Sequence, residues 1–318
     1  MTTFGYFLAS EQWGPQQLVD IARDAERSGF EALWISDHFH PWNGEQGQSA
    51  FVWSTIGALS QAVSLPVTTA VTCPTVRIHP AVIAHAAATC QVLLKGRFRL
   101  GVGTGEALNE HILGDPWPPA RIRRDMLEEA VEVMRKLWGG RVVNHDGPHY
   151  TVHDARLYTL PDEPPPVYVS GFGPKSARLA GRIGDGFVTM SPDTDAIAEF
   201  RAGGGEGKPL AAGVKVCWGP NEGECVEFVR RTWFNEALPG DLAQVLPAPR
   251  HFELVSDVVT ADAVAASFPC GPDVERHVAA VQAYVDAGFD EIYVSQMGQD
   301  TKGFFAFYEK EVLPRVRR

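Results

Sequence analysis

Positive charge is scarce in this sequence of 318 residues. Its 28 lysines and arginines are outnumbered by 39 aspartates and glutamates, which gives a formal charge of −11, and the basic residues form no dense run that could follow a nucleic-acid backbone. No stretch approaches the ~20 apolar residues of a membrane helix. The first ten residues lack the basic and apolar regions of a signal peptide. We therefore expect a cytoplasmic protein whose partner is a small molecule.

Cysteine is also scarce, and none of it occurs in a C-x-x-C pair. The five cysteines are scattered along the chain: Cys73, Cys90, Cys217, Cys225 and Cys270. Unpaired, dispersed cysteines are typical of a reducing compartment, and this spacing argues against a zinc site built from thiolates.

Short apolar segments alternate with amphipathic ones along most of the chain. Predicted strands begin at Phe4 and Leu33 and continue at 66–72, 98–102, 166–170, 186–190, 213–218 and 291–295. Predicted helices lie at 15–29, 51–63, 81–94, 121–137, 174–183, 193–201, 273–288 and 302–316. Eight strand–helix units predict an α/β fold, a single TIM (β/α)8 barrel spanning 1–318. Insertions are expected near 141–160, as a hairpin, and near 219–270, where the pattern of 222–268 assigns no clear elements.

The segment LWISDHFHPW ends the second predicted strand in polar side chains. Asp37, His38 and His40 follow its apolar residues, and Trp42 comes soon after. Side chains at the carboxyl ends of parallel strands form the active sites of barrel enzymes. His38 and His40 invite a metal-hydrolase hypothesis, but the later strand ends supply no second histidine set. The competing hypothesis is an imidazole held by a carboxylate, which suits proton removal at neutral pH.

The segment GVGTGEALNE follows the fourth predicted strand. Its glycines allow close approach of backbone to a flat or anionic ligand, and Glu106 leads toward Asn109 and Glu110. The G-x-G-x-G spacing differs from the G-x-G-x-x-G of dinucleotide-binding folds. It therefore indicates a ligand loop without an NAD fingerprint, although a solvated surface acid is the simpler interpretation of Glu106.

The segment VSGFGPKSAR runs from the fifth predicted strand into a helix. Proline near the first helical turn, free backbone N–H groups and a nearby lysine are typical of a phosphate seat, although an ordinary helix start is an equal alternative. The residues of this seat are Gly171, Phe172, Gly173, Pro174, Lys175 and Ser176. TIM-barrel phosphate seats usually follow strands seven and eight, so this place implies an unusual cofactor position.

Together, SDHFHPW, GVGTGEALNE and GFGPKSAR resemble the bacterial luciferase-like superfamily, in particular its coenzyme F420-dependent branch typified by F420-dependent glucose-6-phosphate dehydrogenase. The resemblance extends over nearly the whole chain. It implies a TIM barrel, usually homodimeric, that binds a deazaflavin at the strand carboxyl ends and acts as an oxidoreductase on CH–OH groups. It also implies a cis peptide at Ala70–Val71.

The resemblance implies a role for each site residue. His38 would take the hydroxyl proton during hydride transfer, Asp37 would lie beside the cofactor, and Trp42 would line the reacting face. Glu106 would protonate the reduced ring. The residues implied to bind the cofactor are Asp37, Val71, Cys73, Gly105 and Asn109, together with the seat at 171–176.

One departure concerns the substrate. The dehydrogenase branch grips a sugar phosphate with basic side chains, and a rough alignment places Asp193, Ala243 and Ala265 there. Lys208, Arg231 or Arg250 are possible substitutes. Three hypotheses result: an F420-dependent alcohol or sugar-phosphate dehydrogenase, an FMN-dependent monooxygenase or reductase of the same superfamily, and a metal-dependent hydrolase.

Overall fold

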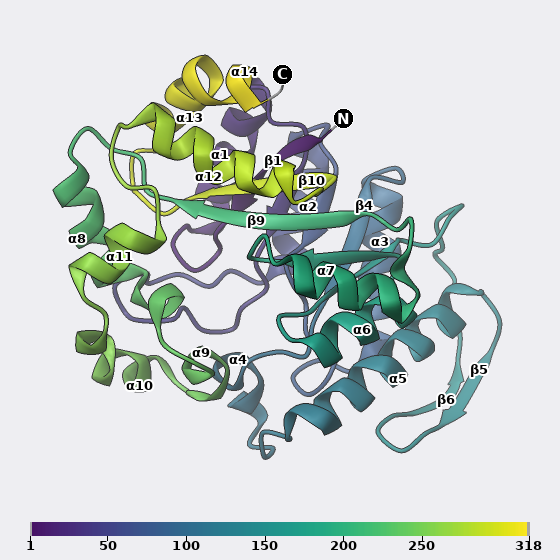
Figure 1. The fold of residues 1–318 in the computed structure, drawn as a ribbon. Coiled ribbons are helices and arrows are strands. Elements are labelled where there is room, and N and C mark those ends of the chain that lie inside the picture. The colour runs from purple at the N-terminus through teal and green to yellow at the C-terminus, as the bar shows by residue number, and fades with distance from the viewer. Residues whose placement is uncertain (1, 317–318) are drawn as a thin grey trace.

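A closed barrel of parallel strands forms the centre of the computed structural model, which describes residues 2–316 (Figure 1). Around the barrel the strands run in the order β1-β10-β9-β8-β7-β4-β3-β2, and each pairs in parallel with its neighbours. Their bounds are β1 (Thr3–Leu8), β2 (Leu33–Ile35), β3 (Val67–Thr69), β4 (Phe98–Val102), β7 (Val167–Ser170), β8 (Gly186–Thr189), β9 (Leu210–Val216) and β10 (Glu291–Gln296). The predicted TIM barrel is confirmed.

Amphipathic helices surround the barrel, because each buries one apolar stripe against the strands. In α1, for example, Leu18, Ile21, Ala22 and Ala25 are buried, as their helical spacing predicts. The surrounding helices are α1 (Pro15–Arg27), α2 (Val52–Ala62), α3 (Pro80–Leu93), α5 (Ala120–Trp138), α6 (Pro174–Ile183), α7 (Thr194–Phe200), α12 (Val274–Asp286), α13 (Thr301–Phe307) and α14 (Leu313–Val316). Within residues 2–316, no helix combines the length and apolarity of a membrane span.

Both predicted insertions leave the barrel alternation. The first is an antiparallel hairpin, β5 (Val143–Asp146) and β6 (Thr151–Ala155), at the lower right of Figure 1. The second contains short helices: α8 (Glu222–Thr232), α9 (Leu242–Val245), α10 (Pro249–Leu254) and α11 (Ala261–Ser267). Its apolar side chains join Trp42 and Leu108 in one buried cluster. The second insertion therefore packs over the carboxyl ends of the strands.

The structure differs from the predicted strand bounds most clearly at β3 and β9. β3 ends at Thr69, where the predicted strand continued to 72, and the Ala70–Val71 peptide is cis, as expected. β9 begins three residues earlier than predicted. The glycine-rich segment 203–207 begins as a wide helical turn, η2 (Arg201–Gly205). A side chain on Gly203 would overlap the Arg178 carbonyl, so the glycine lets this turn lie directly against α6.

Candidate active site

A cleft of about 260 Å³ opens at the carboxyl ends of β3, β4 and β7. It brings together the segments GVGTGEALNE and VSGFGPKSAR with Val71 from the loop after β3, whereas no residue of LWISDHFHPW lines it. The sequence-predicted residues that line it are Val71, Gly105, Glu106, Gly171, Phe172, Gly173 and Ser176. Residues that the sequence did not single out also line it, namely Arg123 and Arg124 at the start of α5 and Asp241 and Gln244 beside α9.

Bare backbone forms part of this cleft. A side chain on Gly103 would lie 2.8 Å from Val71 Cγ2, and one on Gly105, whose φ is +77°, would overlap the Cys73 sulfur. Only glycine therefore fits at these two positions, because the loop backbone packs directly against Val71 and Cys73. Cys73 itself lies buried beneath Gly105 and bonds Thr75 Oγ1 at 2.9 Å. Burial raises the pKa of its thiol well above the usual range, so Cys73 remains uncharged.

The start of α6 forms the opposite wall. A side chain on Gly171 would lie 2.8 Å from the amide nitrogen of Ala177, so the loop passes close over the first helical turn. The first amides of a helix are free to bind an anion. Ser176 and the backbone around Gly171 line the cleft, whereas Pro174 and Lys175 are exposed outside it.

Arginine brings positive charge to this cleft. Arg123 donates from Nη1 to the Gly105 carbonyl at 3.3 Å, and its guanidinium lies 4.2 Å from the Trp117 ring. Burial lowers the pKa of Arg123 from its ordinary value, but an arginine remains charged at neutral pH. The clustered arginines of ARIRRD were the sequence signal for this feature.

His38 faces a carboxylate that the sequence analysis did not identify. Nε2 of His38 lies 3.4 Å from Oε1 of Glu11, and both side chains are largely buried. The other oxygen of Glu11 accepts from Ser36 Oγ at 2.7 Å. The Trp42 ring lies 5.1 Å from the imidazole. Glu11 comes three residues after the end of β1, so its position at a strand end was the available signal.

Asp37 and Asn109 connect the loops around His38. Asp37 is buried and accepts from Thr72 Oγ1 at 2.8 Å and from Arg77 Nη2 at 2.9 Å. Arg77 also donates from its backbone to the Glu110 carboxylate at 2.7 Å. Neither Asp37 nor Asn109 lines the cleft. These contacts tie the β2 end to the loop after β3.

The Asn109 carboxamide joins the His38 loop to the cleft. Its oxygen accepts from the backbone amides of Phe39 and His40 at 2.9 and 3.2 Å. Its nitrogen lies 3.4 Å from Oε2 of Glu106. His40 uses Nδ1 to bond the Leu108 carbonyl at 3.0 Å, so it holds the loop together. Asn109 therefore sets the position of Glu106 relative to the His38 loop.

The structure gives the metal-hydrolase hypothesis no support. In the part of the chain that it describes, no three His, Cys, Asp or Glu side chains are grouped as metal ligands. The ring nitrogens Nδ1 of His38 and His40 bond separate backbone carbonyls, at 3.3 and 3.0 Å.

The candidate substitutes for a phosphate grip have other partners or lie outside the cleft. Lys208 donates to the carbonyls of Gly181 and Gly184, at 2.7 and 2.9 Å, so it binds the end of α6. Asp193 caps α7 by accepting from two backbone amides. Arg250 is exposed on α10. None of these residues, nor Ala243 or Ala265, lines the cleft.

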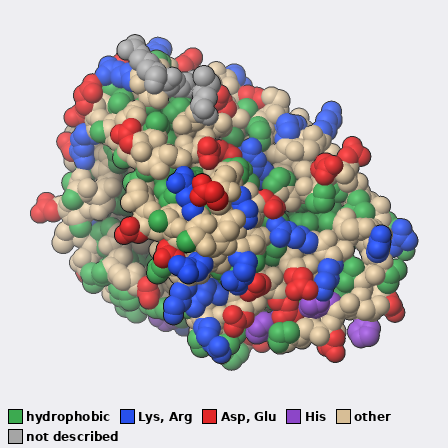
Figure 2. Space-filling model, turned by 45° about the vertical axis from the view of Figure 1, so that its right-hand side comes forward, with side chains coloured by type: hydrophobic (Ala, Val, Ile, Leu, Met, Phe, Trp, Pro, Cys, Tyr) green, Lys and Arg blue, Asp and Glu red, His purple; other side chains and the backbone are tan. Residues whose placement is uncertain are grey.

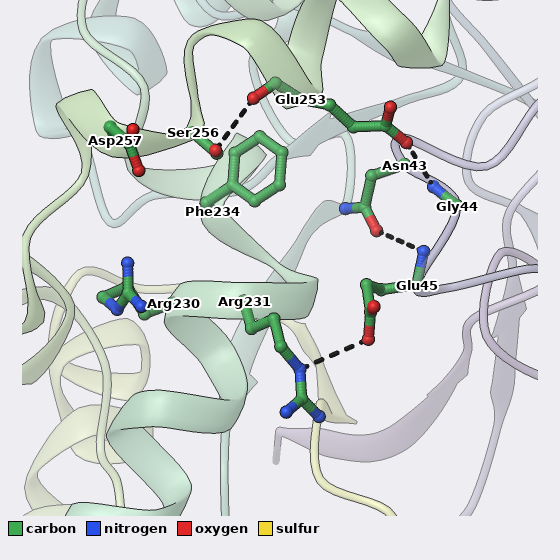
Figure 3. Close-up of a pocket in the computed structure, with 9 residues that line it drawn as sticks. All are labelled: Asn43, Gly44, Glu45, Arg230, Arg231, Phe234, Glu253, Ser256 and Asp257. Carbon is green, nitrogen blue, oxygen red and sulfur yellow. Dashed lines mark hydrogen bonds and ion pairs between the residues drawn. The ribbon is translucent and has the colours of Figure 1, made fainter.

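Arg231 lies at a second cavity of about 380 Å³, next to α8 and α10 (Figure 3). Its guanidinium points toward Glu45, with Nε 3.2 Å from Oε2, and Glu253 reaches across to the Gly44 amide at 3.0 Å. Arg230 pairs with Glu227 on its own helix. The two arginines that line this cavity are thus neutralised by nearby carboxylates, and the cavity is a poor site for an anion.

Comparison with known proteins places this geometry in a family. The model of a family described as luciferase-like monooxygenase matches residues 2–291. F420-dependent glucose-6-phosphate dehydrogenases from Microbacterium testaceum (strain StLB037) and from Nakamurella multipartita are 36% and 35% identical, over 99% of this chain and 97% and 96% of theirs. A solved F420-dependent secondary alcohol dehydrogenase, in complex with an F420–acetone adduct, has a TM-score of 0.92 at 33% identity and covers 100% of this chain and 99% of its own. The chain belongs to the luciferase-like family.

Proposed function

We propose that this protein is an F420-dependent oxidoreductase that acts on a CH–OH group and its carbonyl counterpart. The observation that carries the proposal is a cleft of glycine backbone, a helix start and arginines, linked through Asn109 to the buried His38–Glu11 pair. The F420-dependent dehydrogenases among the similar proteins support the same cofactor and reaction class.

The residues of the cleft fit the chemistry of the cofactor. Coenzyme F420, when bound, supplies a deazaflavin ring that accepts or gives a hydride. Gly103, Gly105 and Val71 line the cleft together, and a surface of backbone and one apolar side chain suits a flat ring. The first turn of α6, with Ser176, suits its phosphate, and Arg123 and Arg124 complement negative charge.

The proton of the substrate hydroxyl is assigned to His38. The imidazole would take or return that proton, and Glu11 stabilises the charge that the ring then carries. Trp42 lies against this imidazole and excludes water from one side of it. Glu106, whose carboxylate faces the cleft, would hold the proton that is given to the reduced cofactor ring, and Asn109 orients this carboxylate. Asp37, bound to Arg77 and Thr72, supports the His38 loop from below.

The substrate is proposed to carry no phosphate. A phosphate dianion needs several charge-assisted donors. The cations considered for that role, Lys208 and Arg231, bind backbone carbonyls and Glu45 instead. We assign the protein an uncharged secondary alcohol, or the ketone derived from it.

The cofactor assignment is tested by titrating the purified protein with F420 and, separately, with FMN while ligand fluorescence is followed. Tight binding of F420 with weak binding of FMN is expected. The reverse order would replace this proposal with the FMN-dependent monooxygenase or reductase of the same family.

A cytoplasmic homodimer is proposed as the working form. The five cysteines are free and buried, which suits a reducing compartment. The resemblance to homodimeric relatives supports the assembly. Sedimentation of the purified protein at several concentrations tests it, and a mass near the 34.7 kDa of one chain at all concentrations would contradict it.

A further inference from the structure

A polar layer lies above an aromatic plug inside the barrel. The rings of Trp34 and Tyr293 stack at 4.2 Å across the interior. Lys215 and Ser295 are register partners on β9 and β10, and Ser295 is two residues beyond Tyr293. Side chains alternate between the two faces of a strand, and the neighbouring Val294 belongs to the apolar core around the barrel. Lys215 and Ser295 therefore face the interior, one level nearer the carboxyl ends of the strands.

The charge of this layer is balanced. Lys215 forms an ion pair with Glu236, and its ammonium lies 4.9 Å from the centre of the Trp233 ring. Glu236 belongs to η3 (Phe234–Ala237), in the second insertion. The insertion thus closes over the layer and supplies the counter-charge, so the layer has polar atoms but no excess positive charge for an anion.

Three polar atoms of this layer are buried without a hydrogen-bond partner among residues 2–316: Gln12 Nε2, Asn235 Oδ1 and Ser295 Oγ. The second polar atom of each of the two carboxamides does have a hydrogen-bond partner. Gln12 Oε1 accepts from Trp233 Nε1 at 3.1 Å, and Asn235 Nδ2 donates to Glu236 at 2.8 Å. Each amide is therefore held by its neighbours with one end free. Buried polar atoms in folded proteins nearly always have a partner, so these three call for a ligand or ordered water.

The layer adjoins the proposed reaction site. Gln12 follows Glu11, the partner of His38. Trp233, which binds Gln12, follows Thr232, whose carbonyl accepts from Asn43 and Gln46 at 3.0 and 2.9 Å. Asn43 and Gln46 lie one and four residues after Trp42, so the segment that carries His38 and Trp42 also contacts the segment that carries Asn235.

We propose that this layer recognises a second hydroxyl of the substrate. The inference rests on the proposed function and narrows its substrate class to uncharged secondary alcohols with at least one further hydroxyl, and the matching hydroxyketones. A hydroxyl accepts from Gln12 Nε2 and donates to Asn235 Oδ1, and a second such group reaches Ser295 Oγ. A carboxylate or a phosphate dianion has no proton to donate to Asn235 Oδ1, and Lys215, which is paired with Glu236, leaves no unpaired positive charge to bind it.

The kinetic test compares butane-2,3-diol with butan-2-ol in the presence of F420. We expect kcat/KM to be roughly 10- to 100-fold higher for the diol, because each neutral hydrogen bond contributes several-fold and an unsatisfied buried atom opposes binding of the mono-alcohol. In Asn235→Ala, and in Gln12→Leu as a second variant, the preference should fall to roughly threefold or less, since the hydroxyl loses one partner.

Asn144→Ala is the matched control, because Asn144 binds Asp154 on the exposed hairpin and should leave the preference unchanged. Equal use of the two alcohols by the unmodified enzyme would overturn the inference. So would a preference that survives in both Asn235→Ala and Gln12→Leu, or a preference for glucose-6-phosphate over every uncharged compound.

A binding measurement separates this inference from the F420 assignment. Saturation-transfer NMR without any cofactor compares butane-2,3-diol and butan-2-ol against the unmodified protein and Asn235→Ala. Stronger transfer to the diol, lost in the variant, supports the layer even if F420 supports no turnover. Equal transfer to both compounds overturns it even if F420-dependent turnover is found.

Discussion

Nε2 of His38 faces a carboxylate oxygen of Glu11 at 3.4 Å, while Nδ1 of the same ring faces the His40 carbonyl at 3.3 Å. Both neighbours are acceptors, so both ring nitrogens are best satisfied when each carries a proton. A neutral ring satisfies only one of them unless Glu11 is itself protonated. The Glu11 carboxylate is therefore placed to stabilise the positive charge of the ring when His38 takes a proton from the substrate.

Replacing His38 by alanine should lower turnover by roughly 10²–10⁴, as expected for the loss of a proton-transferring group. Affinity for F420 should remain nearly intact, since His38 does not line the cleft. Single-turnover kinetics with a parallel fluorescence titration measures both quantities. Turnover close to that of the unmodified enzyme would remove His38 from the mechanism.

Glu11→Gln should lower kcat by roughly 10- to 100-fold, because an amide cannot stabilise a charged imidazole as a carboxylate does. The amide still offers Ser36 an acceptor, so the fold should survive. A purely structural role for Glu11 predicts an unchanged pH profile of kcat, whereas stabilisation of a charged His38 ring by Glu11 predicts a displaced one. Recovery of rate and profile in Glu11→Asp would complete the assignment.

Glu106→Gln should slow hydride transfer while the protein still folds and binds F420. The carboxylate faces the cleft, and its contact with Asn109 Nδ2 at 3.4 Å is retained by the glutamine oxygen. Stopped-flow absorbance of the cofactor measures the transfer step. Complete loss of F420 binding would make Glu106 a cofactor anchor and contradict its role as proton donor.

Glucose-6-phosphate should be a poor substrate. Charge-assisted hydrogen bonds contribute ~1.5–3 kcal/mol each, so losing two raises KM by roughly a hundredfold or more. The aligned Asp193 caps α7 and adds negative charge. A panel of sugar phosphates, alcohols and carbonyl compounds measures kcat/KM. A dominant value for glucose-6-phosphate that falls steeply with salt would contradict this expectation.

Stability should decrease in mild acid because of His277. Burial lowers the pKa of this histidine in the folded state, where its ring bonds Tyr308 Oη and the Gly271 carbonyl, both at 3.0 Å. The unfolded chain then binds a proton at higher pH than the folded one. The contribution of neutral His277 to the free energy of unfolding is therefore complete above pH ~6.5 and is lost as the pH falls below that value.

Denaturant unfolding between pH 5 and 8 measures this effect, and His277→Gln should flatten the dependence on pH. His153→Gln, on the exposed hairpin, is the control and should leave it unchanged. An equal slope in His277→Gln and the unmodified protein would contradict the assignment.

The parts predictable from sequence were those that depend on local patterns. Alternating strands and helices gave the barrel, and the glycine runs at 101–105 and 171–173 gave two walls of the cleft. Glu11 and Arg123 were not predicted, because each reaches the site only through tertiary packing. The second insertion was not resolved from its pattern, because most of its helices are too short to show a clear period and prolines interrupt the segment.

The aromatic plug of Trp34 and Tyr293 has a kinetic consequence. Below it, toward the amino ends of the strands, Glu291 binds Arg99 at 2.5 Å and accepts from the hydroxyls of Tyr293 and Tyr168 at 2.6 and 3.2 Å. Among the described residues 2–316, these side chains fill the amino end of the interior, so a ligand is expected to enter from the carboxyl ends of the strands, beneath the second insertion. If the cofactor and the substrate enter by the same opening, the one bound nearer the opening blocks exchange of the other. Binding should therefore follow a compulsory order, and an excess of the compound that binds second should slow release of the compound that bound first.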